Sequence, residues 1–456
     1  MKSHYAQPRL GTLSNMADVS TLPDAHDGEP LTDSLPADLV ADVDRIIDAD
    51  TDRLVETFKD IHRNPELGFA EVRTARIIEL ALQNLGFDIT TGIGTTGVAA
   101  IYRNGDGPVV MYRADMDALA VQEETGVEYA SEKRVTREDG TEVPVAHVCG
   151  HDAHVTWMLG MAHALIELKN RWSGTLVLIG QPAEEPITGA KAMVDDGLYN
   201  FIPRPDVFIG MHTAPAPVGV VVSSPGPRLA GTDQLDILFH GVGGHGSMPQ
   251  KAKDPVLMAA MAIVEFQTIV SRMIDPQQTA VLTVGAVHAG SDNNVIPTQA
   301  LLKANLRWYD PAVREIMLSA VESVADGIAR TYGMPEDKLP EITLKGGSSP
   351  LVNDLELSER MARTLAAVLG DQQIVTDMPR ATGSEDVQLL KGPYPEMPFN
   401  YLLVGIANHE TFAAAQAQGE PFPFAPHNPN YLVDLSAIPF GAKVAAYSML
   451  GLLNRS

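Results

Sequence analysis

The sequence predicts an α/β protein whose mostly parallel sheet is flanked by helices and interrupted by a ferredoxin-like α+β domain. Two observations predict it. Short apolar runs without alternation, typical of strands buried on both faces, occur between helical patterns. Around residue 225 the runs begin to alternate, and the order becomes β-α-β-β-α-β. The chain has 456 residues, 45% of them hydrophobic, which is long enough for two or three domains.

Two helical patterns and four apolar runs make up the first half of the chain. Apolar residues recur at helical spacing over 39–61 and 74–85, and the second pattern stops at Gly86, a residue that commonly ends helices. The apolar runs are rich in Val, Ile and Leu, and they span 98–102, 109–113, 175–180 and 207–212. We expect them to form the central sheet, separated by helices.

The segment 225–346 is expected to be an inserted domain. Its strands are predicted over 234–240, 280–287, 298–308 and 341–345, and its helices over 254–273 and 311–332. The α/β pattern resumes with a helix over 354–369, a strand near 400–404 and a helix from about 436. The predicted organisation is a mobile extension (1–36), one α/β domain in two pieces (37–224 and 347–456) and the insertion (225–346).

Composition and charge argue against several classes of function. The 33 Lys and Arg against 58 Asp and Glu leave a net charge of −25, which disfavours nucleic acid and anionic membranes as partners. We expect no membrane span, and the N-terminus lacks the apolar core of a secretory signal. Cys149 is the only cysteine, so no intramolecular disulfide can form. These features favour the cytoplasm.

Acidic residues follow two of the predicted strands, at the edge where open α/β sheets bind ligands. Asp115 and Asp117 follow the run over 109–113 and can point the same way from an extended segment. A solvated turn is the alternative. Glu184 and Glu185 follow the run over 175–180. One can bind a metal while the other acts as a general base, unless they form a plain surface pair.

Sulfur and imidazole ligands gather nearby in the predicted fold. Cys149 and His151 open a predicted helix, His212 ends a strand, and His427 lies in a proline-rich loop. Thiolate and imidazole bind Zn²⁺ and similar ions well, whereas a lone buried Cys is more often a small hydrophobe. With Glu185 these side chains exceed what one four-coordinate ion needs, which indicates two ions sharing a ligand.

Eight segments, in this order, resemble a known family. They read HRNPELG (62–68), RADMDAL (113–119), CGHDAH (149–154), QPAEE (181–185), GGH (243–245), NVIP (294–297), GSED (383–386) and HNP (427–429). The sequence is similar to the metal-dependent amidohydrolases that include hippurate hydrolase, indoleacetyl-amino-acid hydrolase and N-acyl-amino-acid deacylase, relatives of aminoacylase and of dinuclear-zinc carboxypeptidases.

The resemblance implies an activity and a role for each matching residue. The activity is hydrolysis of the amide bond of N-acyl or N-aroyl amino acids, in a homodimer formed through the inserted lid. Two divalent ions, of Zn, Mn, Co or Ni, would be held by Cys149, His151, Glu185, His212 and His427. Glu184 matches the general base, and His245 matches a lid residue that stabilises the tetrahedral intermediate. Substrate contacts are implied for Asn294 and Arg307, and a supporting role is assigned to Asp115 and Asp117.

Departures from the family pattern leave the specificity open. Gly246 and Ser247 follow His245, where relatives more often have Ala-Ala, and Thr298 stands where an acid is common. Two other enzyme classes remain as alternatives: a metal-dependent dipeptidase or carboxypeptidase, and a hydrolase with Cys149 as nucleophile. A third alternative is a metal- or ligand-binding relative without catalysis.

Overall fold

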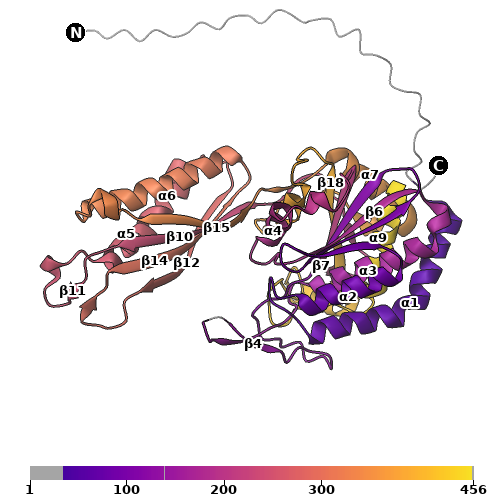
Figure 1. Cartoon of the computed structure of the whole chain (residues 1–456), viewed down its shortest axis with the longest axis horizontal. Helices are drawn as coiled ribbons and strands as arrows, with labels where there is room; N and C mark the ends of the chain where they lie inside the picture. Colours follow the sequence, from indigo (N-terminus) through magenta and orange to yellow (C-terminus); the bar gives the residue numbers. More distant parts are fainter. Residues whose placement is uncertain (1–33, 138, 454–456) are drawn as a thin grey trace, which may run out of the picture. The chain divides into compact units, whose positions relative to one another are not determined.

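The structure is a computed structural model that describes residues 34–137 and 139–453. The predicted extension over 1–36 therefore lies almost entirely outside the described residues. Figure 1 shows a large sheet with helices on its faces and a smaller sheet with its own helices. The predicted fold class is confirmed.

The large sheet is parallel in its centre and has antiparallel pairs on both sides of that centre. Strands β6, β3, β7 and β18 run parallel to one another, whereas β1 pairs antiparallel with β2, β2 with β6, and β8 with β18. The strand order is β1 (Asp88–Ile93), β2 (Gly97–Asn104), β6 (Gly174–Gln181), β3 (Val109–Asp115), β7 (Val207–Pro217), β18 (Phe399–Ala407), β8 (Val221–Val222), β17 (Ile374–Val375). No helix separates β2 from β3, contrary to the expected alternation. Strand β2 runs antiparallel and β3 parallel to β6, which lies between them, so the chain only has to reverse direction over the short connection 105–108.

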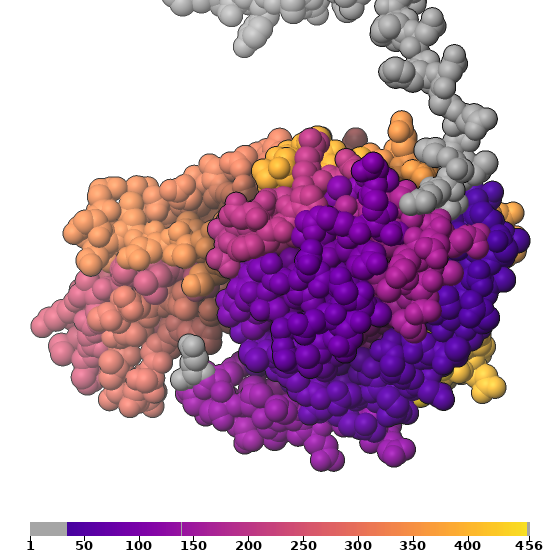
Figure 2. Space-filling model, turned by 45° about the vertical axis from the view of Figure 1, so that its right-hand side comes forward, coloured from indigo at the N-terminus to yellow at the C-terminus, as the bar shows by residue number. Residues whose placement is uncertain are grey.

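Successive residues of the central strands pack into two different cores. Tyr112 and Leu178 belong to the core on one face, and Met111 and Val177 to the core on the other. This double burial is why the strands read as unalternated apolar runs. The first core includes side chains of α1 (Ala37–Arg63), α2 (Val72–Asn84), α3 (His151–Glu167), α7 (Leu355–Leu369) and α9 (Ala437–Leu453), and the second those of α4 (Gly189–Asp195). In the space-filling view of Figure 2, the indigo-to-purple part of the described chain covers most of the face turned to the viewer in this domain.

The smaller sheet has the predicted β-α-β-β-α-β order and is antiparallel throughout. Its strands lie in the order β12 (Ala280–Ala289), β14 (Gln299–Trp308), β10 (Gly231–His240), β15 (Glu341–Ser348). Helices α5 (Pro255–Thr268) and α6 (Pro311–Thr331) share its core through Phe266 and Met317. Asp254 and Asp310 cap these helices, each followed by a proline that is favourable at the first helical position. We call residues 231–348 the lid.

A short ribbon joins the two connections to the lid. It pairs β9 (Gly226–Leu229) with β16 (Leu351–Asn353). The predicted domain division near 225 and 346 stays a prediction. Several short elements were not expected from the sequence, and they include β1, β4 (Arg134–Thr136), β5 (Glu142–Pro144) and α8 (His409–Ala417).

Helix α5 and its continuation form the most apolar helical stretch of the lid. By length and composition alone, Pro255–Met273 is long and apolar enough to cross a membrane, and a single helix of this kind is weak evidence for a span. Only one side of the helix packs into the lid core, including Met258 and Phe266. The outer side exposes Val256, Leu257, Met261 and Val264. We call these four side chains the outer face of α5.

Candidate metal centre

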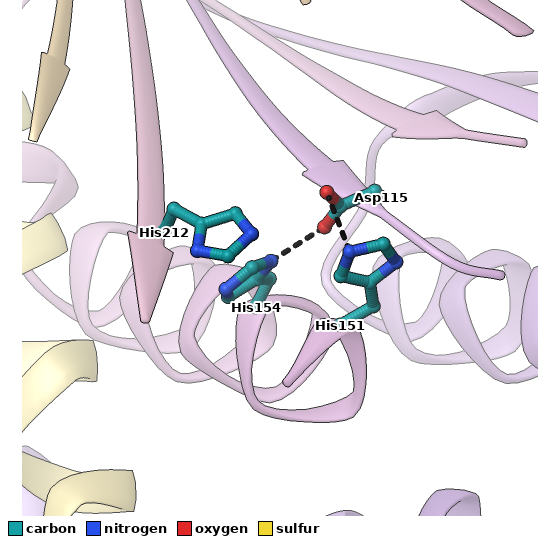
Figure 3. Close-up of side chains that lie close together, drawn as sticks. All are labelled: Asp115, His151, His154 and His212. Carbon is teal, nitrogen blue, oxygen red and sulfur yellow. Dashed lines mark hydrogen bonds and ion pairs between the residues drawn. The ribbon is translucent and has the colours of Figure 1, made fainter. Parts of the chain in front are cut away.

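The metal-ligand candidates meet at the carboxyl edge of the large sheet. Neighbouring strands β6, β3 and β7 are parallel, so their carboxyl ends lie together. Helix α3 begins at this edge with His151, and β7 contributes His212. One ligand atom from each of Asp115, His151, His154 and His212 lies within 4.8 Å of the others (Figure 3).

Two further groups share members with each other or with the first. His151, Glu184 and Glu185 can place one ligand atom each within 4.8 Å of one another, and so can Cys149, Glu185 and His427. The Cys149 Sγ lies 3.5 Å from His212 Nε2, which joins the groups. His427 Nε2 lies 3.3 Å from Glu185 Oε2. The structure thus brings together the five side chains predicted as ligands and the adjacent Glu184.

Several buried ligand atoms have no hydrogen-bond partner among the described residues. They are both ring nitrogens of His151 and Oε1 of Glu185. The His151 nitrogens lie 3.3 Å from oxygens of Asp115 and Asp117, without hydrogen-bond geometry. Buried polar atoms are normally satisfied, and cations would satisfy these. The mixed thiolate, imidazole and carboxylate set suits divalent transition metals, so the residues present fit a metal centre.

His212 is held in the tautomer that a metal ligand needs. Its Nδ1–H donates to the carbonyl oxygen of Thr213 at 2.7 Å, which leaves a lone pair on the Nε2 that faces Cys149. This type of outer hydrogen bond orients metal-binding histidines generally. Burial lowers the pKa of His212 to about 3, so the ring is neutral at ordinary pH.

Comparison with known proteins gives the family. The description "Peptidase family M20/M25/M40" matches residues 111–449. The chain belongs to this family of metal-dependent hydrolases.

Several named proteins are similar to this chain over most of its length. IAA-amino acid hydrolase ILR1-like 2 of Arabidopsis thaliana is 32% identical over 404 residues, 87% of this chain and 84% of that protein. Hippurate hydrolase of Campylobacter jejuni is 40% identical over 272 residues, 59% of this chain and 68% of that protein. A crystal structure of the Bacillus subtilis YXEP protein, a dinuclear metal binding peptidase from the M20 family, has a TM-score of 0.66 and 28% identity. The match covers 89% of this chain and 99% of that one.

Asp117 connects the two glutamates of this M20/M25/M40 enzyme to a histidine. Its carboxylate accepts hydrogen bonds from the backbone N–H of Glu184 and of Glu185, each at 3.0 Å. The same carboxylate lies 3.3 Å from His151 Nδ1. Asp117 therefore positions the glutamate loop against the start of α3.

Asp115 and His154 satisfy each other and do not face the centre as free ligands. Asp115 accepts from His154 Nδ1–H at 2.5 Å and from Arg113 at 2.7 Å. The Nε2 of His154 accepts the Thr213 backbone N–H at 2.9 Å. Both nitrogens of this ring are thus occupied, which leaves Cys149, His151, Glu185, His212 and His427 as the ligand candidates.

A buried ionic network beneath Glu184 was not assigned a role from the sequence. Arg113 is fully buried and donates to Glu385 at 2.8 Å, and Tyr401 donates to the same carboxylate at 2.6 Å. Asp386 accepts from Gln181 Nε2 at 2.6 Å. The GSED segment had marked two of these residues, but only the fold brings them to Glu184.

A second missed residue, Glu71, holds the glutamate loop from the other side. It is fully buried and accepts from the backbone N–H of Ala183 at 2.8 Å and from Thr96 Oγ at 2.6 Å. Ala183 has a φ of 47°, in the left-handed region that few non-glycine residues adopt. The bond from Glu71 helps to hold that conformation one residue before Glu184. Its place near the HRNPELG segment was the available signal.

Burial shifts the acid–base properties of the centre in one direction. It raises the pKa of Glu184 well above its ordinary value, with the charges of Glu385 and Glu185 adding to the effect. Burial also raises the pKa of Glu185 to about 8 and that of the Cys149 thiol to about 12. A thiol with so high a pKa is a poor nucleophile, which disfavours the cysteine-nucleophile alternative.

Among the described residues, those of the lid predicted to contact substrate are not bonded to the metal-ligand candidates. His245 and Asn294 are exposed, and in the described part of the chain no hydrogen bond or ion pair joins them to the ligands. They share a ribbon in which β11 (Gly244–His245) pairs with β13 (Val295–Ile296). Arg307, on β14, donates from Nε to Asn305 at 2.6 Å and from Nη1 to Ser384, which fixes its guanidinium plane next to the GSED segment.

Proposed function

We propose that this enzyme is a dinuclear-metal amidohydrolase that cleaves N-acyl or N-aroyl amino acids to a carboxylic acid and a free amino acid. The main support is that Glu184 lies with five candidate ligands, of which both His151 ring nitrogens and Glu185 Oε1 are buried without a hydrogen-bond partner among the described residues. The names of two relatives, a hippurate hydrolase and an IAA-amino acid hydrolase, support this substrate class.

Cys149, His151, Glu185, His212 and His427 would hold the two ions, of Zn, Mn, Co or Ni. When bound, the ions supply Lewis acidity and lower the pKa of water. Glu184 takes a proton from the water that attacks the amide carbonyl and returns it to the leaving amine. Burial and the neighbouring carboxylates raise the pKa of Glu184, which makes its carboxylate a stronger base than an exposed one.

Lid residues would orient the substrate and stabilise the developing oxyanion. His245 donates a hydrogen bond to the carbonyl oxygen as it becomes negative, the kind of interaction that contributes most to many acyl transfers. Arg307 would receive the substrate carboxylate, which its planar fork matches well. Asn294 lies on the same ribbon as His245 and would bind the carbonyl or the carboxylate.

We infer that the enzyme is a cytoplasmic homodimer joined through the lid. The outer face of α5 exposes four apolar side chains next to one another on a helix. Apolar patches of this kind often mark sites of contact with another protein. Strand β12 is an edge strand of the lid sheet and is also exposed along much of its length, which leaves a second element free for pairing.

A metal-reconstituted hydrolysis screen tests the proposal. N-acetyl and N-benzoyl amino acids and Gly-X dipeptides are each offered with Zn²⁺, Mn²⁺, Co²⁺ and Ni²⁺. We expect turnover of the acylated amino acids and a loss of 10²–10⁴-fold in Glu184→Gln, with Glu56→Gln on the exposed side of α1 as the matched control. Turnover of dipeptides alone would indicate a dipeptidase. Metal binding without turnover would indicate a silent relative and contradict the proposal.

A further inference from the structure

His245 is held in place by the ribbon that carries it. Gly244 and His245 pair with Ile296 and Val295 across β11 and β13. The pairing extends one residue further, because the Gly246 N–H donates to the Asn294 carbonyl at 2.7 Å. The backbone of His245 is therefore fixed although its side chain is exposed.

A turn directly after His245 folds back under the imidazole ring. The Met248 N–H donates to the His245 carbonyl at 2.8 Å and closes the turn. This places the Ser247 backbone N–H 3.1 Å, and the Ser247 Oγ 2.8 Å, from His245 Nδ1. An exposed histidine thus has one of its two nitrogens contacted twice by the same residue.

These two contacts determine which nitrogen carries the proton. A backbone N–H can only donate, so Nδ1 must offer a lone pair to Ser247. A neutral imidazole has one N–H and one lone pair, so the proton lies on Nε2. The Ser247 hydroxyl can donate or accept, and beside a lone pair it donates.

We propose that Ser247 is a positioning residue that fixes His245 as the Nε2–H tautomer and presents Nε2–H as a hydrogen-bond donor. The inference rests on the proposed function, because it gives His245 a definite task at the substrate. A donor at this place matches an oxygen that gains negative charge, such as the carbonyl oxygen of an amide under attack. It does not match a general base, which would need a lone pair on Nε2.

The test combines a spectroscopic readout with kinetics on the full-length, metal-loaded enzyme. Protein labelled with ¹⁵N-histidine reports the tautomer of each ring, and the His245→Gln spectrum identifies the signal of His245. We expect Nε2–H in the wild type, a mixture of tautomers in Ser247→Ala, and recovery in Ser247→Thr, whose hydroxyl can make the same bond. The backbone N–H remains in every variant, so the shift in Ser247→Ala is expected to be partial.

Kinetics then show whether the tautomer matters. One lost neutral hydrogen bond corresponds to roughly a tenfold change at most. We expect kcat of Ser247→Ala to fall about three- to tenfold with KM unchanged, and Ser247→Thr to restore it. A merely structural role would lower the melting temperature and not change the ratio of tautomers.

Two results would overturn the inference. One is an Nδ1–H signal for His245 in the wild type. The other is a Ser247→Ala variant whose tautomer or kcat equals that of the wild type. If the wild type turns over no acylated amino acid, the proposed function fails, and the ¹⁵N spectra still decide whether Ser247 fixes the ring.

Discussion

The metal centre and the lid ribbon hold their functional residues in opposite ways. At the centre, His151 and Asp117 are almost fully buried. On the ribbon, His245 and Asn294 are exposed, and each is held by backbone pairing and one turn. Burial fixes the geometry of the centre by packing, whereas the ribbon depends on a few hydrogen bonds. Substitutions at the centre should therefore cost far more than substitutions on the lid.

The largest effect is expected at Asp117. In Asp117→Asn the amide –NH₂ faces a backbone N–H, so Glu184 or Glu185 loses its acceptor in a buried loop. Losing a hydrogen bond to a charged acceptor there costs about 1.5–3 kcal/mol. The displacement of Glu184, the proposed general base, lowers the rate further. We expect kcat to fall on the order of 10³-fold and metal affinity to fall about 10–100-fold. Steady-state kinetics and metal titration measure both, with exposed Asp106→Asn as control. A loss below tenfold would contradict this role.

The next largest effect concerns stability against pH at His62. Burial alone would lower the pKa of His62, but hydrogen bonds to Asp152 at 2.6 Å and Glu123 at 3.1 Å raise it to about 9. The folded state then holds a proton that the unfolded state releases near pH 6.5. The stabilisation is full below pH 6.5 and is lost as the pH rises through about 9.

At about 1.4 kcal/mol per pH unit, the free energy of unfolding should fall by about 3 kcal/mol between pH 6.5 and 9 because of His62. Urea unfolding at several pH values measures this for the wild type and for His62→Gln. The difference between the two curves isolates His62, since the other groups titrate in both proteins. Parallel curves for the two proteins would show that this ring does not carry the proton.

A smaller effect is expected for Arg307 on the lid. If its guanidinium binds the substrate carboxylate, Arg307→Ala should raise KM about tenfold for N-benzoyl amino acids, as loss of one exposed charge pair allows. The matching N-benzoyl amino acid amides lack the carboxylate and should be cleaved equally by both proteins. An equal change for acid and amide would mean that the contact between Arg307 and Ser384 serves the lid position and not the substrate.

The same contrast explains how far the sequence predicts the site. Cys149, His151 and Glu185 could be chosen beforehand because each lies at a strand end or helix start inside a recognisable segment. The network under Glu184 could not, since Arg113 and Glu385 are 272 positions apart and meet only in the folded chain. The role of Ser247 was equally hidden, because it depends on the turn that brings its N–H to Nδ1.

The fold shows a similar division between pattern and packing. Long helices and buried strands were predicted because their periodicity is local. The antiparallel edge strand β1 was missed because its exposed residues alternate weakly. A helix over 254–273 was predicted, but the exposure of its outer face was not, because helical periodicity does not show which apolar side chains stay outside the core.

The smallest effect on stability is expected at Val264. The same substitution is also the sharpest test of the lid as an interface. Its side chain is 65% exposed on the outer face of α5, so Val264→Asp should change the free energy of unfolding of one subunit by no more than about 0.5 kcal/mol. In a dimer that buries this face, the same carboxylate would be desolvated without a partner and should weaken association strongly. Analytical ultracentrifugation should show the wild type as a dimer and the variant shifted to monomer, with exposed Gln267→Asp as the control for charge alone. Equal mass for the two variants and the wild type would contradict an interface at this face, because a charge buried there without a partner has to weaken association.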